Sequence, residues 1–459
     1  MCRDELEARL RVLEDENARL KEQVRELLGA LEAARRAGKR QAAPFAKGKP
    51  AATPARPGRK AGPAHGGAAR REPPPSVDEI VVVPLASACP GCGGALVPIG
   101  ESTQVQIELP EPRPRITRYV CQRGRCAGCG QAVSARHPDQ TSAATGAAGV
   151  VLGPRAVAAA ALLHHELGLS WAKVARAGTD VLGLAASRSG WCRAAARVGE
   201  AAGPTDAALL DELGASPAVA LDETGWRVGG RSAWLWTGVG GAVTAFRVAP
   251  GRGFAQATAL IPAGYAGVIE RDGWAPYRRF VDARHQTCLA HLLRRIREMR
   301  EVAAAGAPRR LLAHLARLLQ DALTLRGRRD QGHVDETLLA REREALGARA
   351  DALLRPTPRD PATRRLVAHL RVERQALFTF LERPGVQATN WRAEQAIRPA
   401  VVIRKVWGGH RTWAGARVGQ RLMTLIRTCR QRGLDPLAEM VVLQRAPGPF
   451  VLSLTAAPP

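Results

Sequence analysis

The chain contains 459 residues, enough for two to four domains of about 100–200 residues each. Its 68 lysines and arginines exceed its 42 aspartates and glutamates by 26, so we expect a polyanionic partner, most commonly nucleic acid. No window offers the roughly 18 apolar residues of a membrane span, and the N-terminus is charged from its third residue, unlike a signal peptide. We therefore expect a cytoplasmic protein with no membrane partner. In such a protein the nine cysteines are expected to be metal ligands or free thiols.

Residues 4–36 are predicted to form one helix with a heptad seam. Leucines occupy the d positions (Leu13, Leu20 and Leu27), and Asn17 stands among apolar residues at the a positions. A single asparagine at an a position fixes the register and favours two parallel strands. We therefore predict a coiled coil that joins chains into a homodimer or a higher homo-oligomer. The alternative is an amphipathic helix that packs on its own chain.

A basic linker is expected to follow at residues 37–76. The stretch 35–71 holds eleven lysines or arginines and no acid, mixed with alanine, glycine and proline. Such a segment cannot bury enough apolar surface to fold. We expect a disordered tether that touches phosphate groups without reading sequence.

Residues 77–137 carry two cysteine pairs with the spacing of zinc knuckles. Cys89 and Cys92 are followed, after thirty-three residues, by Cys126 and Cys129, and glycines beside each pair let the backbone turn back toward a metal. Four thiolates at about 2.3 Å make a closed tetrahedral zinc site. We predict a zinc-ribbon DNA-binding domain with one structural Zn²⁺ ion.

Between the knuckles, alternating residues predict two short strands, at Thr103–Leu109 and Arg115–Cys121. Cys121 is an alternative to Cys126 as a ligand, but it lacks the knuckle spacing. We therefore interpret Cys121 as structural.

An alanine-rich helical domain is predicted at residues 150–205. Its helices are expected at 156–167, 170–177 and 186–198, with Gly168 and Gly178 ending the first two. Short helices with tight turns fit a helix-turn-helix that reads DNA through its third helix. The DNA-binding candidates on that helix are Arg188, Arg193 and Arg197. An ordinary three-helix connector is the alternative.

Three acids distant in the sequence suggest a catalytic centre. Asp222 ends an apolar run at 218–222, and Asp272 ends a later predicted strand. Two β-rich runs after Asp222, at 233–239 and 243–248, complete a predicted three-stranded meander with the first run. Glu394 lies at a predicted helix start. Carboxylates so placed can hold two Mg²⁺ ions, which stabilise the attacking and leaving oxygens of a phosphoryl displacement. Glu223 is expected to face away from Asp222 because side chains alternate along a strand, and Asp272 is preferred over Glu270.

The same segments resemble a known family. Asp222-Glu-Thr-Gly-Trp-Arg-Val, Trp234-Leu-Trp236 and Asp272-Gly-Trp-Ala-Pro-Tyr are similar to the catalytic domain of insertion sequence 66 family transposases. Cys288-Leu-Ala-His291-Leu-Leu-Arg and the tail from Asn390-Trp-Arg-Ala-Glu394 to Gly408-Gly-His-Arg411 also resemble that family. The zinc knuckles and the N-terminal heptads match its organisation.

The resemblance implies a multidomain α+β protein with a ribonuclease-H-like α/β catalytic core. Asp222, Asp272 and Glu394 fall on an Asp-Asp-Glu triad that uses Mg²⁺ to cut and join transposon DNA. The implied partners are the terminal inverted repeats of a bacterial element, target DNA and accessory proteins of the same element. The implied location of the protein is the bacterial cytoplasm, in association with the nucleoid. We expect the core at 215–284 and 385–430, a helical insertion at 285–384, and a C-terminal segment at 431–459.

Residues around Glu394 are candidate DNA contacts. Asn390 shares a helix face with Glu394 and could orient its carboxylate or touch a phosphate. A basic run follows, and its candidates are Arg398, Arg404, Lys405 and Arg411. Cys288 and His291 lie on one helix face, and packing, metal binding and DNA contact remain open for them. Two other functions are alternatives: a non-catalytic, domesticated DNA-binding protein, and a nuclease that cuts without joining.

Overall fold

The computed structural model describes residue 9 and residues 13–20, 22–24, 26–27, 74–303 and 305–455. The chain divides into two units, Met1–Leu109 and Pro110–Pro459. Within the predicted heptad segment, residues 13–20 are helical, and the leucines at the d positions expose more than half of their surface. Asn17 and Val24, at a positions, are also described and exposed. The remaining seam positions (6, 10 and 31), and the linker up to residue 73, lie outside the described residues.

The first secondary structure of the second unit is a small hairpin. Strands β1 (Arg123–Arg125) and β2 (Ala132–Ser134) pair antiparallel and enclose the Cys126–Cys129 knuckle. The two strands predicted between the knuckles are wrong, because residues 103–109 and 115–121 are not paired with any described segment. Their apolar side chains are mostly exposed, and the prolines at 110, 112 and 114 interrupt any ladder between them.

Four helices precede the main sheet. Serine side chains accept N-terminal backbone N–H groups in two of them, Ser170 from Lys173 at 3.4 Å and Ser187 from Gly190 at 3.1 Å. The prediction that Gly178 ends a helix is wrong, because Gly178 lies inside α3. A Cβ at this position would come within 2.9 Å of the Trp191 ring, so the glycine allows close packing. The helices are α2 (Pro154–His165), α3 (Trp171–Leu182), α4 (Arg188–Ala201) and α5 (Gly203–Gly214).

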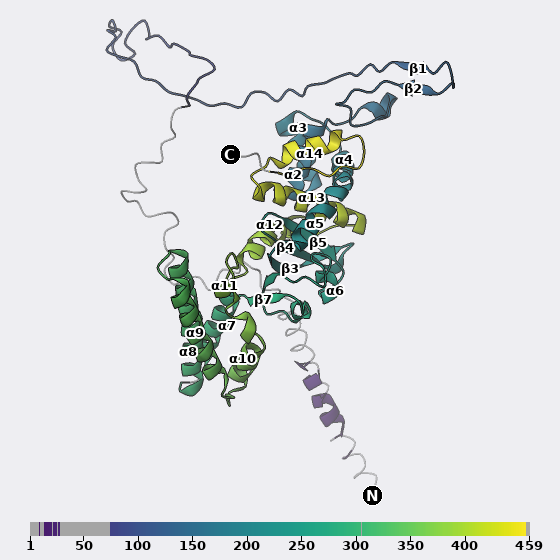
Figure 1. Ribbon diagram of the computed structural model, residues 1–459. Coiled ribbons are helices and arrows are strands. Elements are labelled where there is room, and N and C mark those ends of the chain that lie inside the picture. Colours follow the sequence, from purple (N-terminus) through teal and green to yellow (C-terminus); the bar gives the residue numbers. More distant parts are fainter. Residues whose placement is uncertain are drawn as a thin grey trace. The chain divides into compact units, whose positions relative to one another are not determined.

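A mixed five-stranded sheet forms the centre of the second unit (Figure 1). Its strand order is β5-β4-β3-β6-β7; the first three strands form the predicted antiparallel meander, and β6 and β7 run parallel to β3. The strands are β3 (Ala218–Val228), β4 (Arg231–Val239), β5 (Thr244–Ala249), β6 (Val268–Arg271) and β7 (Arg284–Thr287).

Helices cover the sheet and its β5 edge. Helix α12 (Trp391–Trp407) packs on β3 and β4, and α13 (Trp413–Gln431) packs along β5. Backbone N–H groups of β5 donate to side chains spaced four residues apart on α13, at Gln420, Thr424 and Thr428. An edge strand otherwise exposes these donors to water or to another chain, so α13 closes this side of the sheet.

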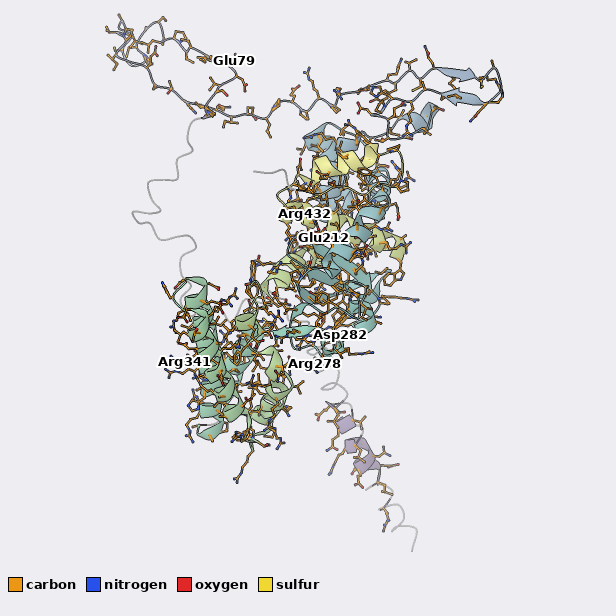
Figure 2. The ribbon with its side chains drawn as sticks, viewed as in Figure 1. Glu79, Glu212, Arg278, Asp282, Arg341 and Arg432 are labelled. Carbon is orange, nitrogen blue, oxygen red and sulfur yellow. The ribbon has the colours of Figure 1, made fainter. Side chains whose placement is uncertain are left out.

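The helices before and after the sheet share one core. Helix α14 (Pro436–Arg445) packs on α2, and α13 packs on α4. Past the end of α13, Arg432 makes a 2.6 Å ion pair with Glu212 of α5 (Figure 2). The buried pair of Arg247 on β5 and Asp206 on α5, at 2.8 Å, joins the same helix to the sheet.

Helices between β7 and α12 build a second apolar core, which includes Leu312, Leu318, Leu366 and Phe380. Helix α8 packs against both α7 and α9. Within the described part of the chain, no helix is both long and apolar enough to cross a bilayer. The helices of this insertion are α7 (Leu289–Val302), α8 (Ala307–Asp330), α9 (Glu336–Leu354), α10 (Pro361–Val372) and α11 (Thr379–Glu382).

Candidate active site

The three sequence-predicted acids (the acid cluster) lie near enough that the charges of Asp272 and Glu394 act on Asp222, although among the described residues they are not a group whose ligand atoms all lie within 4.8 Å of one another. Asp222 lies in the middle of β3 rather than at its end, Asp272 follows β6, and Glu394 is in the first turn of α12. Ala220 pairs with Glu270 across the parallel strands, so two residues later Asp222 and Asp272 are level with each other. Burial, with the charges of Glu223, Asp272 and Glu394, raises the pKa of Asp222 to about 8.

Asn390 connects the helix of Glu394 to the strand of Asp222. Its side-chain amide donates to the Leu221 carbonyl at 2.8 Å, and its backbone N–H donates to the Cys288 sulfur at 3.2 Å. Asn390 is 1 % exposed, so in this structure it is not available to a phosphate. Of the two roles predicted for Asn390, the structure favours orientation of the Glu394 helix.

Glu223 is a fourth carboxylate at the cluster, and sequence reasoning placed it on the opposite face. Burial raises its pKa, and the charge of Asp272 acts in the same direction. The Tyr277 hydroxyl donates to it, and the Arg252 Nε donates to it at 2.6 Å. The Arg252 guanidinium lies 3.9 Å from the centroid of the Trp274 ring. Glu223 is therefore held on the cluster by its own set of donors.

Glu270, the acid weighed against Asp272, has a structural role instead. It is buried at 1 % exposure, and its carboxylate accepts the backbone N–H of Gln387 at 2.8 Å. Its charge is not among the main causes that raise the pKa of Asp222, whereas the charge of Asp272 is. The position at the strand end was the signal that separated the two acids.

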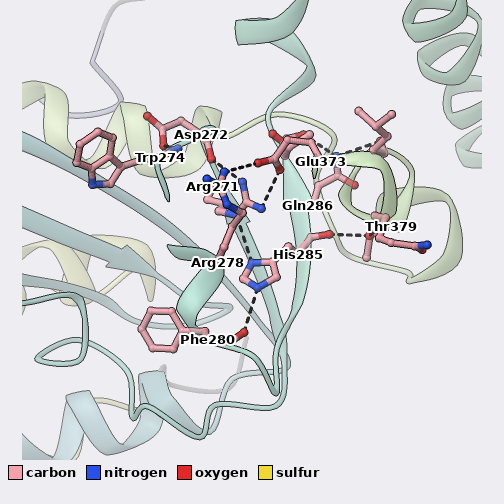
Figure 3. Close-up of polar contacts among 12 residues, drawn as sticks. Arg271, Asp272, Trp274, Arg278, Phe280, His285, Gln286, Glu373 and Thr379 are labelled. Carbon is pink, nitrogen blue, oxygen red and sulfur yellow. Dashed lines mark hydrogen bonds and ion pairs between the residues drawn. The ribbon is translucent and has the colours of Figure 1, made fainter. Parts of the chain in front are cut away.

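A buried ion-pair network holds the loop that carries Asp272 (Figure 3). Arg271 pairs with Glu373 at 2.8 Å, and their side chains are 2 % and 0 % exposed. Arg271 also donates to the Asp272 carbonyl at 2.9 Å and to the His285 ring at 3.2 Å. Arg278 makes a second ion pair with Glu373, at 2.9 Å. The helical insertion that carries Glu373 thereby braces the strand end at the acid cluster.

A pocket of about 370 Å³ opens beside Asp272. Two exposed arginines of α7, Arg294 and Arg295, line it and make no ion pair with any described residue. Its wall also contains Cys288 and His291 from the start of the same helix. The pocket therefore places cationic side chains beside one of the three acids.

The other predicted DNA-binding residues lie in different environments. Arg398 and Lys405 are exposed on α12, whereas Arg404 is half-buried and donates to the Gly225 carbonyl of β3. Arg411 is exposed beyond α12. Burial raises the pKa of the Cys192 thiol, and the charges of Arg193 and Arg411 only partly oppose that shift. The other α4 arginines, Arg188 and Arg197, are also exposed.

Each cysteine knuckle is locally formed. Backbone N–H groups of Gly91 and Cys92 lower the pKa of Cys89, and those of Cys129 and Gly128 lower the pKa of Cys126. Cys121 instead donates to the Gln140 side chain at 3.4 Å. One knuckle belongs to each unit of the chain. A joint site of four sulfurs stays a prediction.

Two family models match the chain. Residues 149–418 match the model described as "Transposase IS66 family", a range that contains Asp222, Asp272 and Glu394. Residues 86–130 match the zinc-finger binding domain of transposase IS66, and all four knuckle cysteines lie in that range. Among curated proteins, the uncharacterized protein y4qI of Sinorhizobium fredii is 26 % identical over 234 residues, which cover 45 % of this chain and 42 % of the relative. The match thus spans less than half the length of that relative.

Proposed function

The chain belongs to the IS66 transposase family, and on that basis we propose that it cuts DNA at the ends of an insertion sequence and joins the freed ends to target DNA. One observation carries this proposal: Asp272 after β6 and Glu394 on α12 lie near enough to Asp222 on β3 that their charges, in addition to burial, raise its pKa. The strand order and directions are those expected of a ribonuclease-H-like core.

The donor set fits divalent magnesium. Asp222, Asp272 and Glu394 offer only carboxylate oxygens, the ligands that Mg²⁺ prefers. Burial and the charges of Glu223, Asp272 and Glu394 raise the pKa of Asp222, and a divalent cation bound to the acids would favour its ionised form. Two bound Mg²⁺ ions would supply positive charge to the attacking and leaving oxygens of a phosphodiester.

The remaining side chains of the centre position these acids. Asn390 keeps the first turn of α12 against β3, so Glu394 stays near Asp222. The Arg271–Glu373 pair fixes the end of β6, and the Asp272 carboxylate accepts the Trp274 backbone N–H at 2.8 Å. With a divalent cation bound, the acids would be ionised. Water attacks the phosphodiester at the element end and displaces its 3′ oxygen; the freed 3′ hydroxyl then attacks a target phosphodiester and displaces the 3′ oxygen of the target strand.

Exposed cations on α12 extend away from Glu394. Arg398 lies one turn beyond Glu394, and Lys405 lies eleven residues beyond it on nearly the same face. At 1.5 Å per residue, the two cations lie about 6 Å and 16 Å along the helix from Glu394. We propose that these two cations contact successive phosphates of the DNA strand whose scissile bond lies at the acids. Arg294 and Arg295 would contact phosphates on the other side of that bond.

The N-terminal regions provide end recognition and pairing in this proposal. A zinc ribbon at 77–137, with Zn²⁺ on Cys89, Cys92, Cys126 and Cys129, and the helical domain at 150–205 bind the terminal repeats. The heptad segment at 4–36 pairs two chains, and the exposure of its described leucines in a single chain supports that pairing.

The test uses the purified full chain, Mg²⁺ and a duplex that carries the end of the element, with a supercoiled plasmid as target. We expect Mg²⁺-dependent strand cleavage and covalent joining of the cut end to the plasmid. Cleavage with no joining of pre-cut ends would instead indicate a nuclease. Binding of the duplex without cleavage at any Mg²⁺ concentration would indicate a non-catalytic DNA-binding protein.

A further inference from the structure

A group of potential metal ligands that includes sulfur and nitrogen shares Glu394 with the acid cluster. Among the described residues, Cys288, His291 and Glu394 form a group whose potential ligand atoms all lie within 4.8 Å of one another. We propose that these three residues bind a Zn²⁺ ion, separate from the zinc predicted for the four knuckle cysteines.

The separations suit a tetrahedral ion. Zinc bonds of about 2.0–2.3 Å place neighbouring ligand atoms about 3.3–3.8 Å apart. The His291 Nδ1 and the Glu394 Oε1 are 3.7 Å apart, which is long for a hydrogen bond but matches an edge of that tetrahedron. The Cys288 sulfur lies within 4.8 Å of the ligand atoms of the other two residues.

The ligand atoms are held ready for such an ion. The His291 Nδ1 is buried and has no hydrogen-bond partner, a costly state for a polar atom unless another group binds it. Cys288 is 2 % exposed, and its sulfur accepts the backbone N–H of Asn390 at 3.2 Å, which fixes the position of the sulfur. The Cys288 to His291 spacing at the start of α7 puts both side chains on one face.

The chemistry of this set differs from that of the magnesium centre. A sulfur and an imidazole nitrogen favour zinc, whereas Mg²⁺ prefers oxygen ligands. Three protein ligands leave one position open, and Cys288 and His291 line the 370 Å³ pocket through which water or a phosphate oxygen can reach it. Glu394 belongs to both sets of ligands, so this ion would sit directly against the proposed reaction centre.

Zinc content of the full chain tests the proposal without any DNA reaction. Each protein is loaded with Zn²⁺, passed over a weak chelator and analysed for zinc per chain. We expect two ions in the parent and one in a Cys126→Ser/Cys129→Ser variant. In that background, His291→Ala should leave none, whereas His369→Ala, which changes another histidine of the same pocket, should keep one. The proposal is overturned if the His291→Ala and His369→Ala proteins retain equal zinc.

Cobalt spectroscopy guards against misfolding as the explanation. In the same double-serine background, Co²⁺ should give a thiolate-to-cobalt charge-transfer band. Cys288→Ser should abolish that band while the circular dichroism and the thermal midpoint stay unchanged, and Cys192→Ser should keep it. A band of full intensity in a folded Cys288→Ser protein would contradict the assignment. Both readouts are independent of strand cleavage, so they stand or fall separately from the transposase proposal.

Discussion

Replacing Glu373 by glutamine should destabilise the protein strongly, because it removes the counter-charge of a buried arginine. The Arg271 side chain is 2 % exposed and pairs with Glu373 at 2.8 Å. Loss of one partner of a buried pair costs about 3–5 kcal/mol, since the remaining charge stays out of water. The second partner, Arg278, is 34 % exposed and should add less than about 1 kcal/mol. We expect a total loss of about 3–5 kcal/mol in the free energy of unfolding.

Urea unfolding, followed by tryptophan fluorescence, measures this loss, and the chain offers a matched control. Glu382 pairs with Arg284 at 2.9 Å in the same insertion, but those side chains are 39 % and 55 % exposed. Glu382→Gln should therefore cost only about 0–1 kcal/mol. If both variants lose the same free energy, burial of the Arg271–Glu373 pair does not brace the strand end, and the reasoning is refuted.

Three further predictions concern stability against pH, positioning and DNA contact. Burial lowers the pKa of His164 to about 4, so the stability that the neutral ring contributes is present above about pH 6.5 and is lost as the pH falls toward 4. Between about pH 7 and pH 5, the free energy of unfolding in urea should fall by about 2 kcal/mol less for His164→Phe than for the parent. An equal fall in both proteins would contradict the burial argument. Asn390→Ala should slow strand cleavage while leaving the Kd for element-end DNA unchanged, and a normal cleavage rate would remove its positioning role. Arg398→Ala and Lys405→Ala should each reduce the salt dependence of DNA affinity by about one unit of log K against log salt, measured by fluorescence anisotropy, and unchanged slopes would exclude phosphate contacts.

The sequence predicted the meander and the convergent acids because both depend on local patterns. Alternating residues and glycines mark β4 and β5, and a carboxylate before Gly273 marks a strand end. The predicted end of the first strand at Asp222 was wrong, since β3 continues to Val228. The antiparallel partner β4 pairs with β3 along its whole length, so that Val228 lies opposite Arg231. The length of a strand depends on such pairing, and the sequence of one strand alone does not show where the pairing ends.

The contacts that hold the site in place could not be predicted from sequence. Asn390 and Leu221 are 169 residues apart, and Arg271 and Glu373 come from a strand and from the inserted helices. No periodicity links residues across such distances. Cys288 and His291 were recognised as a pair on one helix face, but their third neighbour, Glu394, became visible only when α7 and α12 were placed together.

Strand cleavage by conservative amide variants tests the central claim most directly. Asp222→Asn, Asp272→Asn and Glu394→Gln each keep the size of the side chain and remove its charge. With Mg²⁺ and element-end duplex, we expect all three to bind the DNA as the parent does and to show no cleavage above background. Glu270→Gln, which changes the buried acid two residues before Asp272, should retain cleavage. Parental cleavage by any one of the three amide variants would contradict the assignment of that acid and, with it, the proposed reaction centre.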